Sequence, residues 1–189
     1  MANQFSWQAV VAGVGGQGVL FLTRLLALAA QEKAGRILIS EVHGMAQRGG
    51  SVVSHLKAGE FASPLVTMGQ ADLVLSLEPG EAVRNVPYLA PGAVLVVNAP
   101  GPAFLSVEGR ENLAARDIRL VCVDAAGTAR REGFPRAGNV VLAAAAAQAG
   151  ALPFSPAEMA AQLAALTPPA RQDANTRLFE AGLALTRAA

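Results

Sequence analysis

The sequence predicts a three-layer α/β/α sandwich built on a mainly parallel, mixed sheet. Short apolar segments rich in β-branched residues alternate with amphipathic segments of helical length, a pattern typical of strands and helices in such a sheet. Of the 189 residues, 52% are hydrophobic and only 15% are charged, so the chain can bury a large core. Neither an internal repeat nor a linker divides the sequence. We therefore expect residues 1–189 to form a single domain.

The expected elements follow one another along the chain. Apolar or alternating segments predict strands at residues 7–12, 36–42, 51–57, 72–77, 93–97 and 118–123. Helical spacing and end signals predict helices at residues 17–33, 79–85, 139–149, 155–166 and 171–187. We also expect an antiparallel element, because residues 49–57 and the Gly59-Glu60 turn resemble one arm of a hairpin.

A glycine-rich turn joins the first strand to the first helix, in the run Gly13-Val14-Gly15-Gly16-Gln17-Gly18. Free N–H groups at a helix N-terminus favour an anion or a carbonyl oxygen. The spacing of Gly13, Gly15 and Gly18 is the G-x-G-x-x-G of Rossmann-like dinucleotide folds, and Glu41 ends the next strand, near where such folds place a ribose-binding acid. A nicotinamide or flavin nucleotide site is one interpretation. A tight turn without a ligand is the other.

A second dense stretch, residues 40–55, contains both histidines of the chain. Its candidate residues for ligand or subunit contact are Glu41, His43, Gly44, Met45, Arg48, Gly49, Gly50 and His55. The Arg48 guanidinium can make a bidentate pair and the Met45 thioether is adaptable, properties that suit a partner protein or a phosphate-bearing ligand. Taken singly, Glu41 and His55 are more typical of ordinary hydrogen-bonded strand residues. Together, the residues indicate a functional loop.

Several classes of function are disfavoured. The single cysteine, Cys122, stands in an apolar run and is typical of a small buried hydrophobe, whereas an iron–sulfur cluster needs about four cysteines. No His and Cys residues have zinc spacing, so we expect no metal on this chain. A net charge of +1 gives no case for nucleic acid. No apolar run is long enough to span a bilayer and no signal peptide is visible, so we expect a cytoplasmic chain without a membrane partner.

Four stretches taken together resemble one family. They are Gly13–Val19, Ser40–His55, Ser63-Pro64-Leu65 and Ala71–Pro79, and the likeness continues through Asn139–Leu142 and Asn175–Gly182. This combination resembles the gamma domain of the thiamine-diphosphate-dependent 2-oxoacid:ferredoxin oxidoreductases. The loop between Glu41 and Gly50 looks most like the branch of that family that acts on indolepyruvate.

The resemblance implies a role within an enzyme complex. Such a complex decarboxylates an arylpyruvate, joins the acyl group to coenzyme A and passes electrons to ferredoxin. In the family a larger alpha subunit carries the thiamine diphosphate, its Mg and the iron–sulfur clusters. This chain is then a non-cluster subunit, inactive alone and without catalytic residues of its own. Its candidate residues for cofactor or subunit contact are Gly13, Gly15, Gly16, Gln17, Gly18, Glu41, His43, Gly44, Met45, Arg48, Gly49, Gly50 and His55. The alternative is a free-standing dinucleotide- or flavin-binding reductase subunit.

Overall fold

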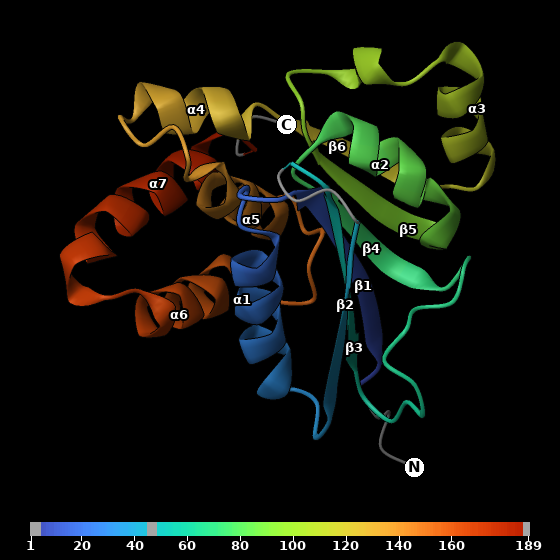
Figure 1. Ribbon diagram of the computed structural model, residues 1–189, viewed down its shortest axis with the longest axis horizontal. Helices are drawn as coiled ribbons and strands as arrows, with labels where there is room; N and C mark the ends of the chain where they lie inside the picture. The colour runs from blue at the N-terminus through green and yellow to red at the C-terminus, as the bar shows by residue number, and fades with distance from the viewer. Residues whose placement is uncertain (1–4, 45–48, 187–189) are drawn as a thin grey trace.

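A six-stranded sheet runs through the middle of the molecule, in the strand order β2-β3-β1-β4-β5-β6 (Figure 1). The structure is a computed structural model that describes residues 5–44 and 49–186. The strands are β1 (Trp7–Val14), β2 (Ile37–His43), β3 (Ser51–Ala58), β4 (Ala71–Ser76), β5 (Leu89–Asn98) and β6 (Arg119–Val123). β3 is antiparallel to both of its neighbours, β2 and β1, whereas the pairings β1–β4, β4–β5 and β5–β6 are parallel.

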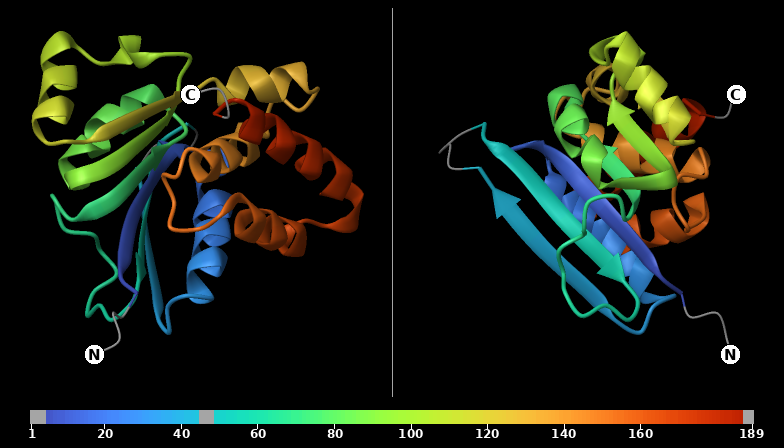
Figure 2. Two further views of the ribbon diagram at one scale, coloured as in Figure 1. Left: turned by 180° about the vertical axis from the view of Figure 1, so that it is seen from behind. Right: turned by 90° about the vertical axis from the view of Figure 1, so that its right-hand side faces the viewer.

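Helices cover both faces of the sheet, which confirms the three-layer prediction (Figures 1 and 2). On one side lie α1 (Val19–Gln31), α4 (Ala125–Arg131), α5 (Gly138–Gln148), α6 (Pro156–Leu166) and α7 (Gln172–Ala184). On the other lie α2 (Pro79–Asn85) and α3 (Val107–Ala115). Short 3-10 turns complete the chain at η1 (Val86–Tyr88), η2 (Pro102–Phe104) and η3 (Pro169–Arg171).

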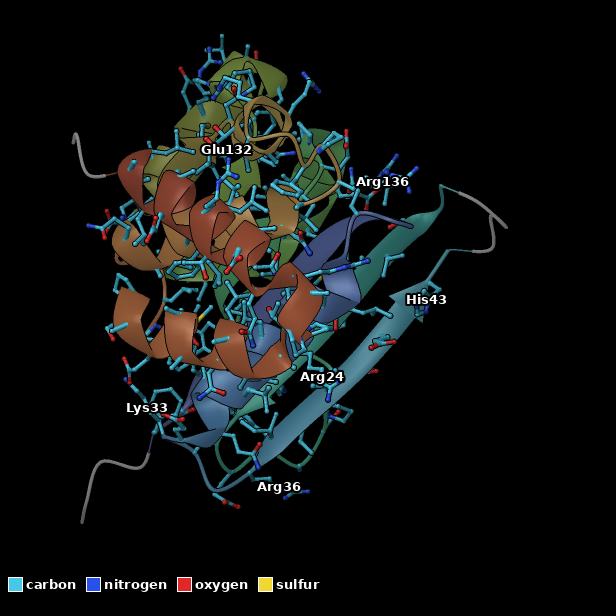
Figure 3. All side chains as sticks on the ribbon, turned by 90° about the vertical axis from the view of Figure 1, so that its left-hand side faces the viewer. Arg24, Lys33, Arg36, His43, Glu132 and Arg136 are labelled. Carbon is cyan, nitrogen blue, oxygen red and sulfur yellow. The ribbon has the colours of Figure 1, made fainter. Side chains whose placement is uncertain are left out.

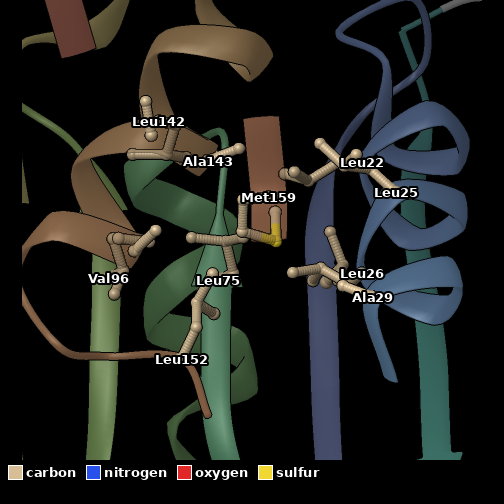
Figure 4. Packing of buried hydrophobic residues seen from close by; sticks show 14 of the residues in the cluster. Leu22, Leu25, Leu26, Ala29, Leu75, Val96, Leu142, Ala143, Leu152 and Met159 are labelled. Carbon is tan, nitrogen blue, oxygen red and sulfur yellow. The ribbon is translucent and has the colours of Figure 1, made fainter. Parts of the chain in front are cut away.

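The larger core cluster lies between the sheet and α1, α5 and α6. The predicted apolar face of α1 is buried there, with Leu22, Leu25 and Leu26 fully inaccessible to solvent, and Met159 fills the space between helices and sheet (Figure 4). In α5 every residue from 139 to 147 is buried. Its many alanines let this helix pack closely against both the sheet and α7, because small side chains allow backbones to approach.

The prediction of an antiparallel strand at residues 49–57 is confirmed, but the prediction that the Gly59-Glu60 turn closes its hairpin is wrong. β2 and β3 form the hairpin, with His43 opposite Val52. After Gly59 the chain passes instead to β4, on the far side of β1. The Gly59-Glu60 turn therefore joins no pair of neighbouring strands.

Two helices, α3 and α4, were not predicted. In α3 only Leu113 is buried, so there is no apolar stripe for periodicity to detect. α4 has only seven residues and depends on its N-cap, where the Asp124 carboxylate accepts a hydrogen bond from the Gly127 N–H at 3.0 Å. Among the described residues, no helix combines the length and the hydropathy needed to cross a bilayer.

Candidate functional site

The glycine-rich turn lies at the point where the chain connections change sides of the sheet. From β1 the chain enters α1 on one face, whereas from β4, the parallel neighbour of β1, it enters α2 on the other. The carboxyl ends of two such strands border a crevice, which is where open α/β sheets bind their ligands. The predicted turn therefore occupies the position of a ligand site in this class of fold.

Three of the four glycines of the turn, Gly13, Gly16 and Gly18, occupy positions where a side chain would be strained or would clash. Gly16 and Gly18 have φ angles of 94° and 87°, in the left-handed region, and Gly18 is the N-cap of α1. A Cβ on Gly18 would overlap with the Asn139 amide nitrogen. A Cβ on Gly13 would lie only 2.9 Å from both Gln17 Oε1 and Val19 Cγ2. The turn is thus closely packed on the α5 side as well as on its own residues.

Three N–H groups of the turn are already bonded within the protein, and one of them is the Gln17 N–H, which donates to the Val14 carbonyl oxygen at 3.1 Å. The Val14 N–H donates to Gln17 Oε1 at 2.8 Å, and the Gly15 N–H donates to the Gly50 carbonyl oxygen at 2.9 Å. Gln17 Nε2 in turn donates to Glu78 Oε2 at 3.1 Å, which places a carboxylate beside the turn. A negative charge here would repel a pyrophosphate. This arrangement disfavours the dinucleotide interpretation.

The strand order separates Glu41 from the turn. In a dinucleotide fold the second strand lies directly beside the first. Here β3 intervenes, with Ser54 paired to both Glu41 and Val11. Two strand spacings of about 4.8 Å each therefore lie between the backbones of β2 and β1. Glu41 lies near the end of the second strand, two residues before His43, but on the exposed outer strand rather than at the ribose position.

Part of the second predicted stretch does meet the glycine turn. His43 is exposed and lies opposite Val52, which is opposite Gly13 on β1. The Gly44 N–H donates to the Ser51 carbonyl oxygen at 2.8 Å, and Gly49 has a φ of 68°. Together with the Gly15–Gly50 hydrogen bond, this brings Gly13–Gly18, His43-Gly44 and Gly49-Gly50 to one edge of the sheet, called the glycine edge below. Met45 and Arg48 lie outside the described residues.

His55 is not at the glycine edge. It pairs with Val10 inside the sheet, is only 3% exposed, and packs edge-on against Tyr88 with ring centroids 5.2 Å apart. Its Nδ1 accepts a hydrogen bond from the Val66 N–H at 3.3 Å. Burial, and then the charge of Lys57, lower the pKa of His55 below 6.5. These contacts fit a neutral structural histidine, as expected from the sequence when His55 is considered by itself.

Two polar residues at the site were not singled out from the sequence. Glu78 follows β4 and reaches Gln17, and Asn139 begins α5 against Gly18. Both lie in stretches that carried the family resemblance, which was the available signal. Nearby, the buried Glu81 accepts from the Ser51 hydroxyl at 2.7 Å and pairs with Arg84. Through this hydrogen bond, Glu81 on α2 contacts the first residue of β3.

No residues in the described ranges are arranged to hold a metal. Residues 5–44 and 49–186 contain no group of three or more His, Cys, Asp or Glu side chains with suitable placement. Cys122 lies partly buried on β6, and burial raises the pKa of its thiol. One thiol of this kind does not fit an iron–sulfur cluster.

Comparisons with known proteins agree with this fold and with the sequence resemblance. Residues 8–185 match the family described as pyruvate ferredoxin/flavodoxin oxidoreductase. Over 190 aligned positions, the chain is 33% identical to indolepyruvate oxidoreductase subunit IorB of Thermococcus kodakarensis and 32% identical to that of Pyrococcus horikoshii, with 94% of each chain covered.

Solved structures share the architecture. The gamma subunit of a keto/oxoacid ferredoxin oxidoreductase from Geobacter sulfurreducens superposes with a TM-score of 0.72 at 22% identity, covering 97% of this chain and 99% of that one. A 2-oxoglutarate:ferredoxin oxidoreductase from Magnetococcus marinus gives 0.76 at 19% identity, covering 97% of this chain but 31% of that longer one. From the family match over 8–185 and the similarity to the IorB subunits, the chain belongs to the pyruvate ferredoxin/flavodoxin oxidoreductase family, as a subunit of an oxidoreductase complex.

Proposed function

We propose that this chain is the small subunit of a cytoplasmic, thiamine-diphosphate-dependent 2-oxoacid:ferredoxin oxidoreductase that acts on indolepyruvate or a related arylpyruvate. One observation carries the substrate class: similarity to subunits named for indolepyruvate extends over 94% of this chain and 94% of theirs.

The proposal divides the chemistry between two chains. Thiamine diphosphate with Mg decarboxylates the 2-oxoacid, coenzyme A takes up the acyl group, and iron–sulfur clusters carry the electrons to ferredoxin. We assign the thiamine diphosphate, the Mg and the clusters to a larger alpha subunit. The single Cys122, and the absence of a metal-binding group in residues 5–44 and 49–186, support that assignment.

The glycine edge is the surface that we assign to contact with the alpha subunit. Large apolar side chains lie exposed beside it: Val42, next to His43, is 51% exposed, and Leu20, in the first turn of α1, is 45% exposed. Exposed apolar side chains next to glycines suit a protein interface, because the apolar groups gain from burial and the glycines let two backbones approach. Coenzyme A is the other candidate for contact with the same loops.

The test compares this chain alone with the chain co-expressed with its alpha subunit. Both samples receive thiamine diphosphate, Mg, coenzyme A and indolepyruvate, and reduction of a viologen dye is followed. We expect turnover by the complex only. Viologen reduction or cluster absorbance from this chain alone would contradict the division of labour.

The same samples test the dinucleotide alternative. A bound flavin would colour the purified chain, and NAD(P)H would quench the fluorescence of Trp7, the only tryptophan, if it bound. We expect neither signal, because Gln17 and Glu78 occupy the crevice where the nucleotide would bind.

A further inference from the structure

A pocket of about 700 Å³ opens between α1, the turn from α4 to α5, and the segment from α6 to α7. Its apolar walls include Phe21, Phe134, Leu166 and Leu178. Its volume is within the range of small-molecule sites, in which apolar walls surround a few polar groups. Asn139 lines this pocket and also packs against Gly18, so the pocket adjoins the glycine edge on its α5 side.

The charged side chains that line the pocket are both cationic. Arg136 and Arg171 both contribute to its lining, and the lining residues include no aspartate or glutamate. Within the described ranges, neither arginine is in an ion pair. Glu132, which precedes the pocket-lining residue Gly133, is paired with Arg177 at 3.2 Å. Figure 3 shows Arg136 on the side of the molecule that carries α6 and α7. The two guanidinium groups are therefore available to an anion.

One of the two helices that begin at this pocket adds to its positive character. The first turn of α5 contributes Asn139 to the lining and contains no acidic residue, whereas that of α7 contributes Ala174 and Asn175 but also contains Asp173. Helix N-termini carry partial positive charge and free N–H groups, so the favourable charge comes from α5, while Asp173 offsets that of α7.

One buried side chain offers a specific donor. Asn139 is only 9% exposed. Its Oδ1 accepts from the Val140 N–H at 3.0 Å, and in the part of the chain that the structure describes its Nδ2 has no hydrogen-bond acceptor. Asn175, by contrast, donates its Nδ2 to Thr167 at 2.9 Å and so joins α7 to the end of α6.

We propose that this pocket binds a small organic anion, with a carboxylate or phosphate on an apolar body. The charged group contacts Arg136, Arg171 and the Asn139 amide, and the apolar body packs among Phe21, Phe134 and Leu178. Recognition of this kind is independent of the subunit role proposed above, because the pocket is defined within this chain alone.

The test is calorimetric titration of the purified chain with three probes of similar size: phenyl phosphate, phenylacetate and the neutral benzyl alcohol. We expect saturable binding of at least one anion and none of the alcohol. Which anion binds separates a phosphate ligand from a carboxylate ligand. Hydrogen exchange should show protection in residues 133–140 and 167–178 on binding.

Three variants locate the effect. Arg136→Ala with Arg171→Ala should weaken binding by about tenfold or more, since a hydrogen bond to a charged group contributes on that order. Asn139→Asp should weaken it similarly, while its carboxylate still accepts from the Val140 N–H and so preserves the start of α5. Arg24→Ala removes a positive charge from α1 outside the pocket lining and is the matched control, with binding unchanged.

Three results would each overturn the proposal. They are a lack of saturable binding for both anions, equal affinity in the double arginine variant with its circular dichroism unchanged, and exchange protection confined to residues 13–19. If the double variant fails to fold, Asn139→Asp decides the matter alone.

Discussion

The Gln17 side chain joins the end of β1 to the start of α2 by accepting from the Val14 N–H and donating to the Glu78 carboxylate. The Gln17 amide thus links the glycine-rich turn after β1 to the Glu78 carboxylate after β4, across the crevice between the two strands. In a nucleotide site of this fold class the same place would be open to phosphate oxygens. The Gln17–Glu78 pair is therefore the observation that most directly separates a subunit-contact loop from a nucleotide loop.

Replacing Gln17 should expose this relationship in stability measurements. Gln17→Ala leaves the Val14 N–H without its partner, and we expect a loss of about 1 kcal/mol in the free energy of unfolding. Gln17→Glu sets two carboxylates side by side and should cost more at pH 7. Urea unfolding at pH 7 measures both losses. The exposed Gln172→Ala is the control; an equal loss there would show that the Gln17 contacts contribute nothing.

The glycine turn should tolerate side chains poorly and in a definite order. Gly18→Val combines a left-handed φ with overlap on Asn139, whereas Gly16→Val has the unfavourable φ but open space around it. A side chain in the left-handed region costs about 1–2 kcal/mol. We therefore expect the melting temperature and co-purification with the alpha subunit to fall most for Gly18→Val and less for Gly16→Val. Gly35→Val, with no atom within 4 Å of the added Cβ and no left-handed φ, is the control. Normal assembly in both turn variants would make this loop an ordinary connection.

His55 should make the fold weaker in acid. Its pKa in the folded chain is lower than its pKa of 6.5 in the unfolded chain. At a pH between the folded and the unfolded pKa, the unfolded chain therefore binds a proton that the folded chain does not. Stability from this residue is therefore complete above about pH 6.5 and is lost as the pH falls toward the folded pKa. His55→Phe preserves the packing on Tyr88 but does not titrate, and its stability should vary less than that of the wild type between pH 7.5 and 5. An unaltered pH profile in His55→Phe would show that other groups account for it.

Arg48→Ala tests the subunit-contact hypothesis at a residue outside the described ranges. Arginine is enriched in interface cores, and leaving its buried partner charge unpaired typically costs about 2–5 kcal/mol of binding. We expect weaker association with the alpha subunit, measured by titration, and an unchanged melting temperature of the isolated chain. A lowered melting temperature with normal binding and turnover would make the loop structural. No change in either quantity would place Arg48 in solvent.

Local features of the sequence determined most of the secondary structure. The α2 helix has the expected bounds, Pro79–Asn85, and Ser155 is the N-cap of α6 in a capping box with Glu158, as its side chain and the following proline indicated. Apolar alternation located β3 within one residue of its observed bounds. These signals could be used because capping, turn conformation and apolar periodicity depend on residues a few positions apart. The α3 helix lacked such a signal, since it buries only Leu113.

Only the tertiary structure decided which residues meet. Glu41 and His55 lie in the same stretch as His43, yet the insertion of β3 beside β1 moves Glu41 two strands away from the glycine turn and turns His55 into the core beneath Tyr88. Conversely, Gln17 with Glu78 and Gly18 with Asn139 are brought together from positions 61 and 121 residues apart. Strand order depends on how the whole apolar surface is buried most completely, a property of all the strands and helices at once, so no local pattern encodes it.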